Sequence, residues 1–161
     1  MNIQVVKKEE IKVIGLAVNS SYSQMSNIPI LFDHMEERMG EILHKTKESI
    51  FIAPFHSRET EFTYYVTVPV EKIESIPNGM IGFVIPSKKY IFATHNGDPS
   101  EVENTYLQMF SWMKEHGYEQ DYHALSLEIY KNESSTINSF GDKLQFDIYL
   151  PLKKSKDLKY D

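Results

Sequence analysis

Each half of this chain carries one apolar stripe at helical spacing, and the stretches around each stripe have the periodicity of strands. The first stripe starts at Ile28, just after the cap-like Asn27, and continues in steps of three and four residues to about residue 45. The second starts after Asp98 with the spacing of a capping box and ends at Gly117. Because an amphipathic helix is stable only when its apolar side is buried, we expect both helices to pack on a sheet.

The other apolar stretches predict the strands of that sheet. Strands are expected at residues 3–18, 49–55, 62–70, 80–85, 90–95, 123–131 and 144–152. We therefore predict an α+β fold, a single domain of residues 1–161, in which duplicated strand-helix-strand-strand halves form an antiparallel sheet with two main helices and a central groove. The halves span about residues 1–74 and 75–161 and repeat the pattern without repeating the letters. An α+β domain without functional symmetry is the alternative.

The composition excludes several classes of site. The chain has no cysteine, so disulfides and thiolate chemistry are excluded. Its six histidines have no zinc-binding spacing and are expected at the surface or in turns; we predict no catalytic residue, no metal and no cofactor. With a formal net charge of −6 the chain is not expected to bind nucleic acid directly. It shows no signal peptide and no apolar run near the ~20 residues that span a bilayer, so we expect a cytoplasmic protein that makes no membrane contact.

Glu128 lies in the middle of a predicted strand, between apolar neighbours. Because strand side chains alternate between faces, Leu127 and Ile129 share one face, which we expect to pack against a helix. Glu128 and Tyr130 share the other face. If that face forms a cleft, burial raises the pKa of the Glu128 carboxyl, and a cationic ligand lowers it again. The alternative is a face open to solvent, with Glu128 as a surface residue.

Aromatic residues give the predicted cleft suitable walls. The chain contains ten Tyr, nine Phe and one Trp, and aromatic rings attract cations by about 0.5–2 kcal/mol each. The stripe of the second helix, including Tyr106, is expected to pack on the sheet, whereas Trp112 lies beside the stripe and can border a cleft. Core packing is the alternative for each strand aromatic. The candidate ligand-binding residues are Glu128, Tyr64, Tyr65, Tyr90, Phe92, Trp112 and Tyr130.

The order and spacing of short motifs resemble the GyrI-like effector-binding domain family, which is also found attached to the DNA-binding modules of AraC- and MerR-type bacterial regulators. The likeness is to free-standing members, including the integron-cassette-associated type, and it spans nearly the whole chain. Motifs that carry it are Ile14-Gly15-Leu16, Phe62-Thr63-Tyr64-Tyr65, Pro77-Asn78-Gly79-Met80, His95-Asn96-Gly97, Leu127-Glu128-Ile129-Tyr130 and Ile148-Tyr149-Leu150-Pro151-Leu152. One departure is Thr67, where many relatives have glycine, which puts the shape of that strand in question.

The resemblance implies a small-molecule binding protein that takes cationic amphipathic compounds into an aromatic groove with Glu128 at its centre. Such a protein would act in transcription regulation or drug sensing, with a cationic lipophilic small molecule as its partner. One alternative is a protein-interaction module that acts on gyrase or on a separate DNA-binding regulator. Another is a hydrolase of reactive electrophiles, in which Glu128 would be a general base.

Overall fold

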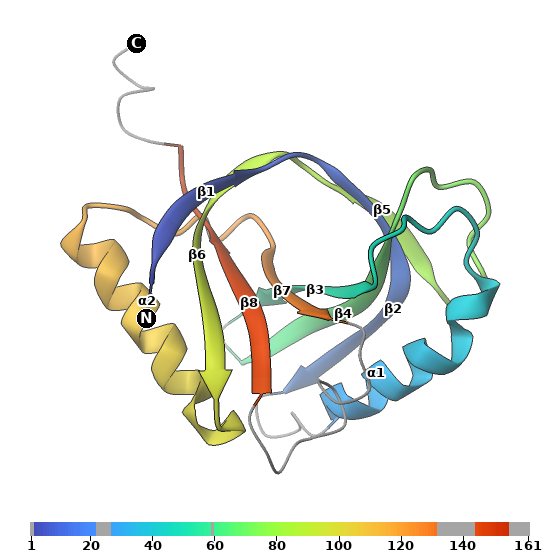
Figure 1. Ribbon diagram of the computed structural model, residues 1–161, viewed down its shortest axis with the longest axis horizontal. Helices are drawn as coiled ribbons and strands as arrows, with labels where there is room; N and C mark the ends of the chain where they lie inside the picture. Colours follow the sequence, from blue (N-terminus) through green and yellow to red (C-terminus); the bar gives the residue numbers. More distant parts are fainter. Residues whose placement is uncertain (1, 22–26, 59, 132–143, 155–161) are drawn as a thin grey trace.

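An eight-stranded antiparallel sheet curls into a half-barrel, and two α-helices lie against its outer side (Figure 1). These elements belong to residues 2–21, 27–58, 60–131 and 144–154, which are the residues that the computed structural model describes. The first half consists of β1 (Gln4–Lys8), β2 (Ile11–Ser21), α1 (Asn27–Arg38), the short 3₁₀ turn η2 (Met39–Glu41), β3 (Ile50–Ser57) and β4 (Glu61–Val70). The second half consists of β5 (Ile81–Ile85), β6 (Lys88–Gly97), the 3₁₀ turn η3 (Pro99–Glu101), α2 (Val102–Glu115), β7 (Ser126–Lys131) and β8 (Leu144–Pro151).

The order of the strands relates the two halves by a pseudo-two-fold axis. From edge to edge the sheet runs β1, β6, β8, β7, β3, β4, β2, β5. Exchanging each strand with its counterpart in the other half gives the same order read backwards. The two halves meet at the centre, where β3 pairs with β7 and Ala53 lies opposite Glu128. The predicted α+β fold with duplicated halves is confirmed.

The outer face of the sheet carries both helices. On this face α1 buries Phe32 and Met35, and α2 buries Met109 and Met113. The sheet residues beneath α1 include Phe51, Ala53, Tyr64 and Val66, and those beneath α2 include Ile91, Ala93, Phe146, Ile148 and Leu150. Each helix therefore packs on its own half of the sheet, and the central strands lie between the two helices.

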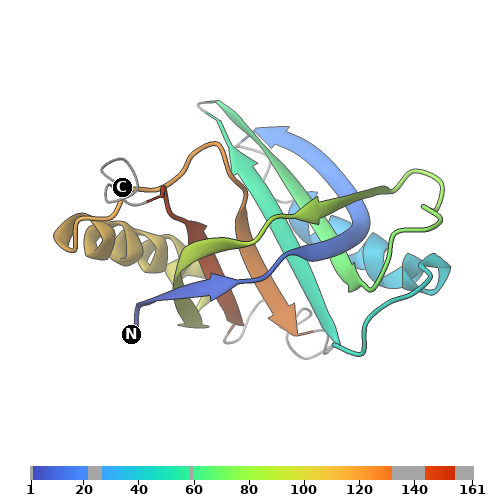
Figure 2. The same ribbon diagram turned by 90° about the horizontal axis from the view of Figure 1, so that it is seen from above.

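The inner, concave face holds a third apolar cluster, which includes no residue of either helix. Leu127 is fully buried there, and Ile129 packs against the same cluster. In the view from above, β1, β5 and β6 cross over the central strands on this side, so the curled sheet covers its own inner face (Figure 2). The expectation that Leu127 and Ile129 face a helix is therefore wrong. Alternation groups these residues correctly, but the helices cover the opposite face.

The first helix is shorter than its apolar stripe suggests. It ends at Arg38 and passes through η2, after which Ile42 has an extended backbone and remains buried. Gly40 explains the early end, because glycine has the largest entropy cost in a helix among residues other than proline. Lys45 is not helical; its ammonium group donates to the carbonyl oxygens of Met39 and Ile42, both at 3.0 Å, at the end of η2.

The second helix starts close to the expected position, but without the expected capping box. The Asp98 side chain makes no cap hydrogen bond. Instead, the backbone carbonyl oxygen of Asp98 accepts a hydrogen bond from the backbone N–H of Glu101 at 3.0 Å. Gly117 follows the helix with φ of +79°, in the left-handed region that glycine adopts without strain. None of the described helices is long and apolar enough to cross a membrane.

Gly15 and Thr67 lie opposite each other where β2 and β4 approach closely. A Cβ atom added to Gly15 would lie 2.1 Å from the Val66 carbonyl oxygen, so only glycine fits there. Opposite Gly15, Thr67 is fully buried, and its hydroxyl donates to the Ile52 carbonyl oxygen of β3 at 2.7 Å. Thr67 thus fits between its neighbours, and pairing of β4 with β2 continues on both sides of it.

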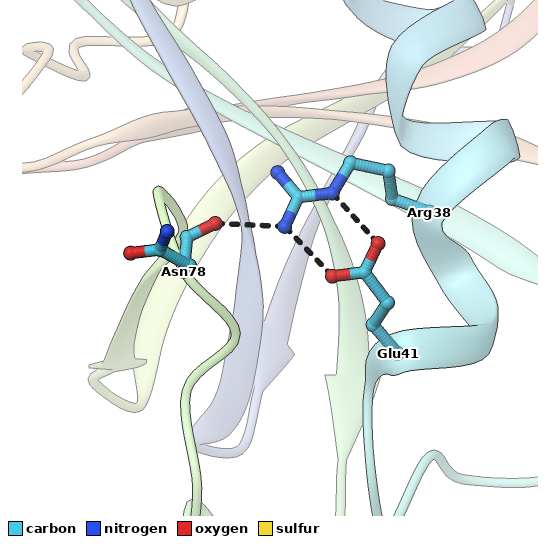
Figure 3. A network of polar contacts seen from close by, with 3 residues as sticks. All are labelled: Arg38, Glu41 and Asn78. Atoms are coloured by element: carbon cyan, nitrogen blue, oxygen red, sulfur yellow. Dashed lines mark hydrogen bonds and ion pairs between the residues drawn. The ribbon is translucent and has the colours of Figure 1, made fainter.

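A polar network joins the end of α1 to the turn before β5. The Arg38 guanidinium donates to both carboxylate oxygens of Glu41, at 2.9 and 2.7 Å, and to the Asn78 carbonyl oxygen at 2.7 Å (Figure 3). The guanidinium lowers the pKa of the Glu41 carboxyl. Since Asn78 lies in the predicted Pro77–Gly79 turn, this contact fixes the link between the two halves against α1.

Candidate functional site

Glu128 lies on β7 at the centre of the outer face. It pairs with Ala53 of β3 on one side and with Ile148 of β8 on the other. These neighbours belong to the clusters under α1 and α2 respectively, so Glu128 lies between the helices. The residue is only 8% exposed, and is therefore not the surface residue that the alternative interpretation required.

Three tyrosines from three elements donate to the Glu128 carboxylate. The hydroxyls of Tyr64 on β4 and Tyr130 on β7 both donate to Oε1 at 2.8 Å. The hydroxyl of Tyr106 on α2 donates to Oε2 at 2.5 Å. An ionised carboxylate can only accept, so the tyrosines must be the donors. The carboxylate thus connects β4, β7 and α2.

His95 contacts the start of α2, the helix that carries Tyr106. Its Nε2 donates to the Asp98 carbonyl oxygen at 3.0 Å, and its Nδ1 lies 2.8 Å from the Thr105 hydroxyl. His95 is 2% exposed, so the expectation that every histidine lies at the surface or in a turn is wrong for this residue. Because Thr105 immediately precedes Tyr106, this contact between β6 and α2 helps to set the position of the Tyr106 hydroxyl.

Burial dominates the electrostatics of this cluster. Desolvation raises the pKa of the Glu128 carboxyl, and the three tyrosine hydroxyls and the nearby His95 lower it, with burial the larger effect. Desolvation also raises the pKa of Tyr64, Tyr106 and Tyr130 well above 10.0, and the negative charge of Glu128 raises each further. The tyrosines therefore remain protonated donors at neutral pH. Among the described residues no lysine or arginine forms an ion pair with Glu128. Its hydrogen-bond partners are neutral hydroxyls, so the carboxylate is able to attract a cation.

A cavity of about 240 Å³ is bordered by Tyr106, whose hydroxyl group reaches the Glu128 carboxylate. Tyr106 and Phe55 form one wall, and their rings meet edge to face with centroids 6.4 Å apart. Phe55 also stacks on Tyr64 at 6.0 Å, so the wall is continuous with the cluster of tyrosines. Phe110, Gln120, Tyr122 and Ser126 contribute to the remaining lining. Tyr106 therefore contacts the carboxylate through its hydroxyl and borders the cavity.

A wider trough of about 660 Å³ lies beside the cavity, along the end of α2. Phe110, Gln120 and Tyr122 line both spaces. Phe110 is 41% exposed and Tyr122 is 69% exposed, which is unusual for large aromatic residues. Aromatic surface therefore extends from the buried carboxylate to the outside of the molecule.

Of the seven residues proposed from the sequence, the structure brings three together: Glu128, Tyr64 and Tyr130. Three others, Tyr65, Tyr90 and Phe92, lie on the inner face. The Tyr65 ring packs on Phe83 at 5.2 Å, whereas the rings of Tyr90 and Phe92 both pack on Tyr149. Trp112 is on α2, where it stacks on His116 at 3.9 Å and on Tyr118 at 5.9 Å.

Sequence reasoning missed Tyr106, which it assigned to packing alone. Tyr106 does pack against the α2 cluster, but its hydroxyl also reaches Glu128. One signal was available: Tyr106 is the tyrosine in a mostly apolar stripe that includes Met109 and Met113. A phenol whose ring is buried needs a partner for its hydroxyl. The cavity residues Phe55 and Gln120 gave no comparable signal.

Comparison with known proteins agrees with this architecture. The family model described as a GyrI-like small molecule binding domain matches residues 1–153. No curated protein matches the chain in sequence.

Solved structures match over nearly the whole chain. The structure of SAV2435 bound to tetraphenylphosphonium has a TM-score of 0.70 at 15% identity, and the match covers 95% of this chain and 94% of that one. EcmrR in its DNA complex has a TM-score of 0.76 at 16% identity, with 96% of this chain and 58% of that one covered. The integron cassette protein VCH_CASS2 of Vibrio cholerae has a TM-score of 0.60 at 14% identity, with 94% and 95% covered. At these identities the likeness establishes the fold.

Proposed function

Because this chain belongs to the family of GyrI-like small-molecule binding domains, we propose that it binds organic cations with an aromatic body in the cavity beside Glu128. The observation that carries the proposal is the buried carboxylate, whose described partners are three neutral hydroxyls. Since burial of this charge is only partly compensated, a positive guest nearby stabilises it.

The cation is expected to lie against the rings of Tyr106 and Phe55. These rings border the cavity, and the hydroxyl group of Tyr106 donates a hydrogen bond to Glu128. A cation in contact with an aromatic ring gains about 0.5–2 kcal/mol, more where water is excluded. The carboxylate adds attraction through a medium of low polarity, where two charges interact more strongly than in water. Direct contact between cation and carboxylate is therefore not required.

The lipophilic part of the ligand is expected to extend into the trough. The exposed rings of Phe110 and Tyr122 form its apolar surface. SAV2435 binds tetraphenylphosphonium, a cation enclosed by aromatic groups, which supports this ligand class for a protein of the same fold. EcmrR is a DNA-bound protein that contains the same fold as a part, which supports a role for this chain in reporting its ligand to a regulator.

A titration with a cationic aromatic compound tests the proposal. Tetraphenylphosphonium is added to the wild-type protein, to Glu128→Gln and to Glu103→Gln, and binding is followed by calorimetry. Glu103 is an exposed carboxylate on α2, so its variant makes the same change in net charge away from the cavity. We expect Glu128→Gln to weaken binding by about tenfold or more and Glu103→Gln to leave it unchanged. Equal affinities for the two variants would contradict the proposal.

A further inference from the structure

Gln120 lies at the junction of the cavity and the trough, on a segment with a fixed backbone. The residue forms a β-bridge with Leu152 just beyond β8. On either side, the Asp121 N–H donates to the Pro151 carbonyl oxygen at 2.8 Å, and the Lys153 N–H donates to the Glu119 carbonyl oxygen at 2.9 Å. Asp121 is also paired with Lys88 of β6 at 2.9 Å. Strand pairing therefore holds the backbone at Gln120, from which its side chain reaches both spaces.

The side-chain oxygen of Gln120 is buried and accepts no hydrogen bond from any described residue. No other fully buried side-chain oxygen or nitrogen of the described residues lacks a hydrogen-bond partner. Burial of an amide oxygen without a donor is unfavourable, and such atoms are rare in folded proteins. A site that binds a ligand can retain such an atom, because the ligand then supplies the donor.

Two other polar side chains of the lining, Tyr106 and His56, already have hydrogen-bond partners. The Tyr106 hydroxyl donates to Glu128, and His56 Nε2 lies 2.9 Å from the Tyr122 carbonyl oxygen. Gln120 is different, since it lines both spaces and its oxygen has no donor. The last torsion of a glutamine side chain is broad, so a modest rotation can open the oxygen to a ligand N–H without moving the backbone.

We propose that the Gln120 oxygen accepts a hydrogen bond from an N–H group of the ligand, so that the cavity prefers protonated amines over quaternary cations of the same shape. This inference rests on the proposed function and defines its ligand class more narrowly. Tyr106 and Phe55 attract any cation by its charge, whereas Gln120 distinguishes a cation that carries a donor. A quaternary ammonium or phosphonium ion has no N–H and leaves the oxygen unpaired.

A matched pair of ligands tests the inference. Dimethyl(naphthylmethyl)ammonium carries one N–H at neutral pH, and trimethyl(naphthylmethyl)ammonium carries none, while charge and ring are the same. Both are titrated against the wild-type protein, Gln120→Met and Gln108→Met. Gln108 is an exposed glutamine on α2 outside the cavity, so its variant controls for the substitution itself. The quantity compared is the ratio of the two dissociation constants within each protein, because quaternary and tertiary cations differ in hydration.

We expect the preference for the tertiary amine to fall by about five- to tenfold in Gln120→Met and to stay unchanged in Gln108→Met. Gln120→Met is also expected to melt at the wild-type temperature or above it, because the substitution removes an unpaired buried oxygen. Equal ratios in the wild type and Gln120→Met, with both ligands bound, would overturn the role of Gln120 alone. If neither ligand binds the wild-type protein, the proposed function fails and this inference fails with it.

Discussion

The two faces of the central sheet use tyrosine in different ways. On the outer face, Tyr64, Tyr106 and Tyr130 point their hydroxyls at one buried carboxylate. On the inner face, Tyr90 and Tyr149 pack ring against ring at 5.8 Å, and burial raises the pKa of each to about 12. Both faces are rich in aromatic side chains, but Glu128 lies on only one of them. Aromatic content therefore does not locate the site; the acceptor that the hydroxyls share does.

Adjacent residues of β4 provide the strongest test of this difference. Tyr64 faces Glu128, and Tyr65 packs on Phe83 on the other face. Replacing Tyr64 by Phe removes a buried hydrogen bond to a charged group, so we expect the free energy of unfolding to fall by about 1.5–3 kcal/mol. Tyr65→Phe should change it by about 0.5 kcal/mol or less. Urea unfolding of both variants measures the difference, and similar losses would show that the two faces are energetically alike.

The pH dependence of cation binding tests whether the charge on the outer face acts on the ligand. Burial raises the pKa of Glu128 above the ordinary value of 4.5, so the carboxylate gains a proton as the pH falls towards this raised pKa. We expect the affinity for tetraphenylphosphonium to fall by about tenfold as Glu128 is protonated, and Glu128→Gln to show no such dependence. A flat profile in the wild-type protein would mean that the carboxylate does not act on the cation.

Without ligand, the contribution of Glu128 to the free energy of unfolding should change with pH in the direction opposite to the binding affinity, over the same range of pH. The folded pKa of Glu128 lies above that of the unfolded chain, so the folded state binds more protons between the two values. The contribution of Glu128 to stability therefore increases as the pH falls from the folded pKa towards the unfolded one. The difference in free energy of unfolding between the wild type and Glu128→Gln, measured across this range, isolates that contribution.

The smallest effect is expected on the inner face. The Lys8 ammonium lies 4.7 Å from the centre of the Tyr149 ring, a contact between a cation and an aromatic ring that already exists within the protein. Lys8→Met should lower the free energy of unfolding by about 0.5–1 kcal/mol and leave the affinity for tetraphenylphosphonium unchanged. Calorimetric titration would detect a change in affinity, which would indicate that ligands also reach the inner face.

Much of this architecture could be predicted from local patterns. The two apolar stripes indicated both helices, and alternation along β7 placed Glu128 and Tyr130 on one face. The first helix was predicted too long because the stripe continues through Gly40 into η2, where Ile42 is buried from a non-helical position. The single predicted strand at residues 3–18 is in fact two strands, β1 and β2, which pair with β6 and β4 respectively.

Local patterns along the chain establish which residues share a face, because side-chain alternation in a strand and the helical period are local properties of the backbone. They also predict that the Glu128 carboxylate lies among apolar neighbours in the middle of a strand. No local pattern could show that the helices cover the Glu128 face or that Tyr106, not Trp112, reaches the carboxylate. Those outcomes depend on the pairing of β3 with β7 and on the curl of the sheet, which join residues that are far apart in the chain.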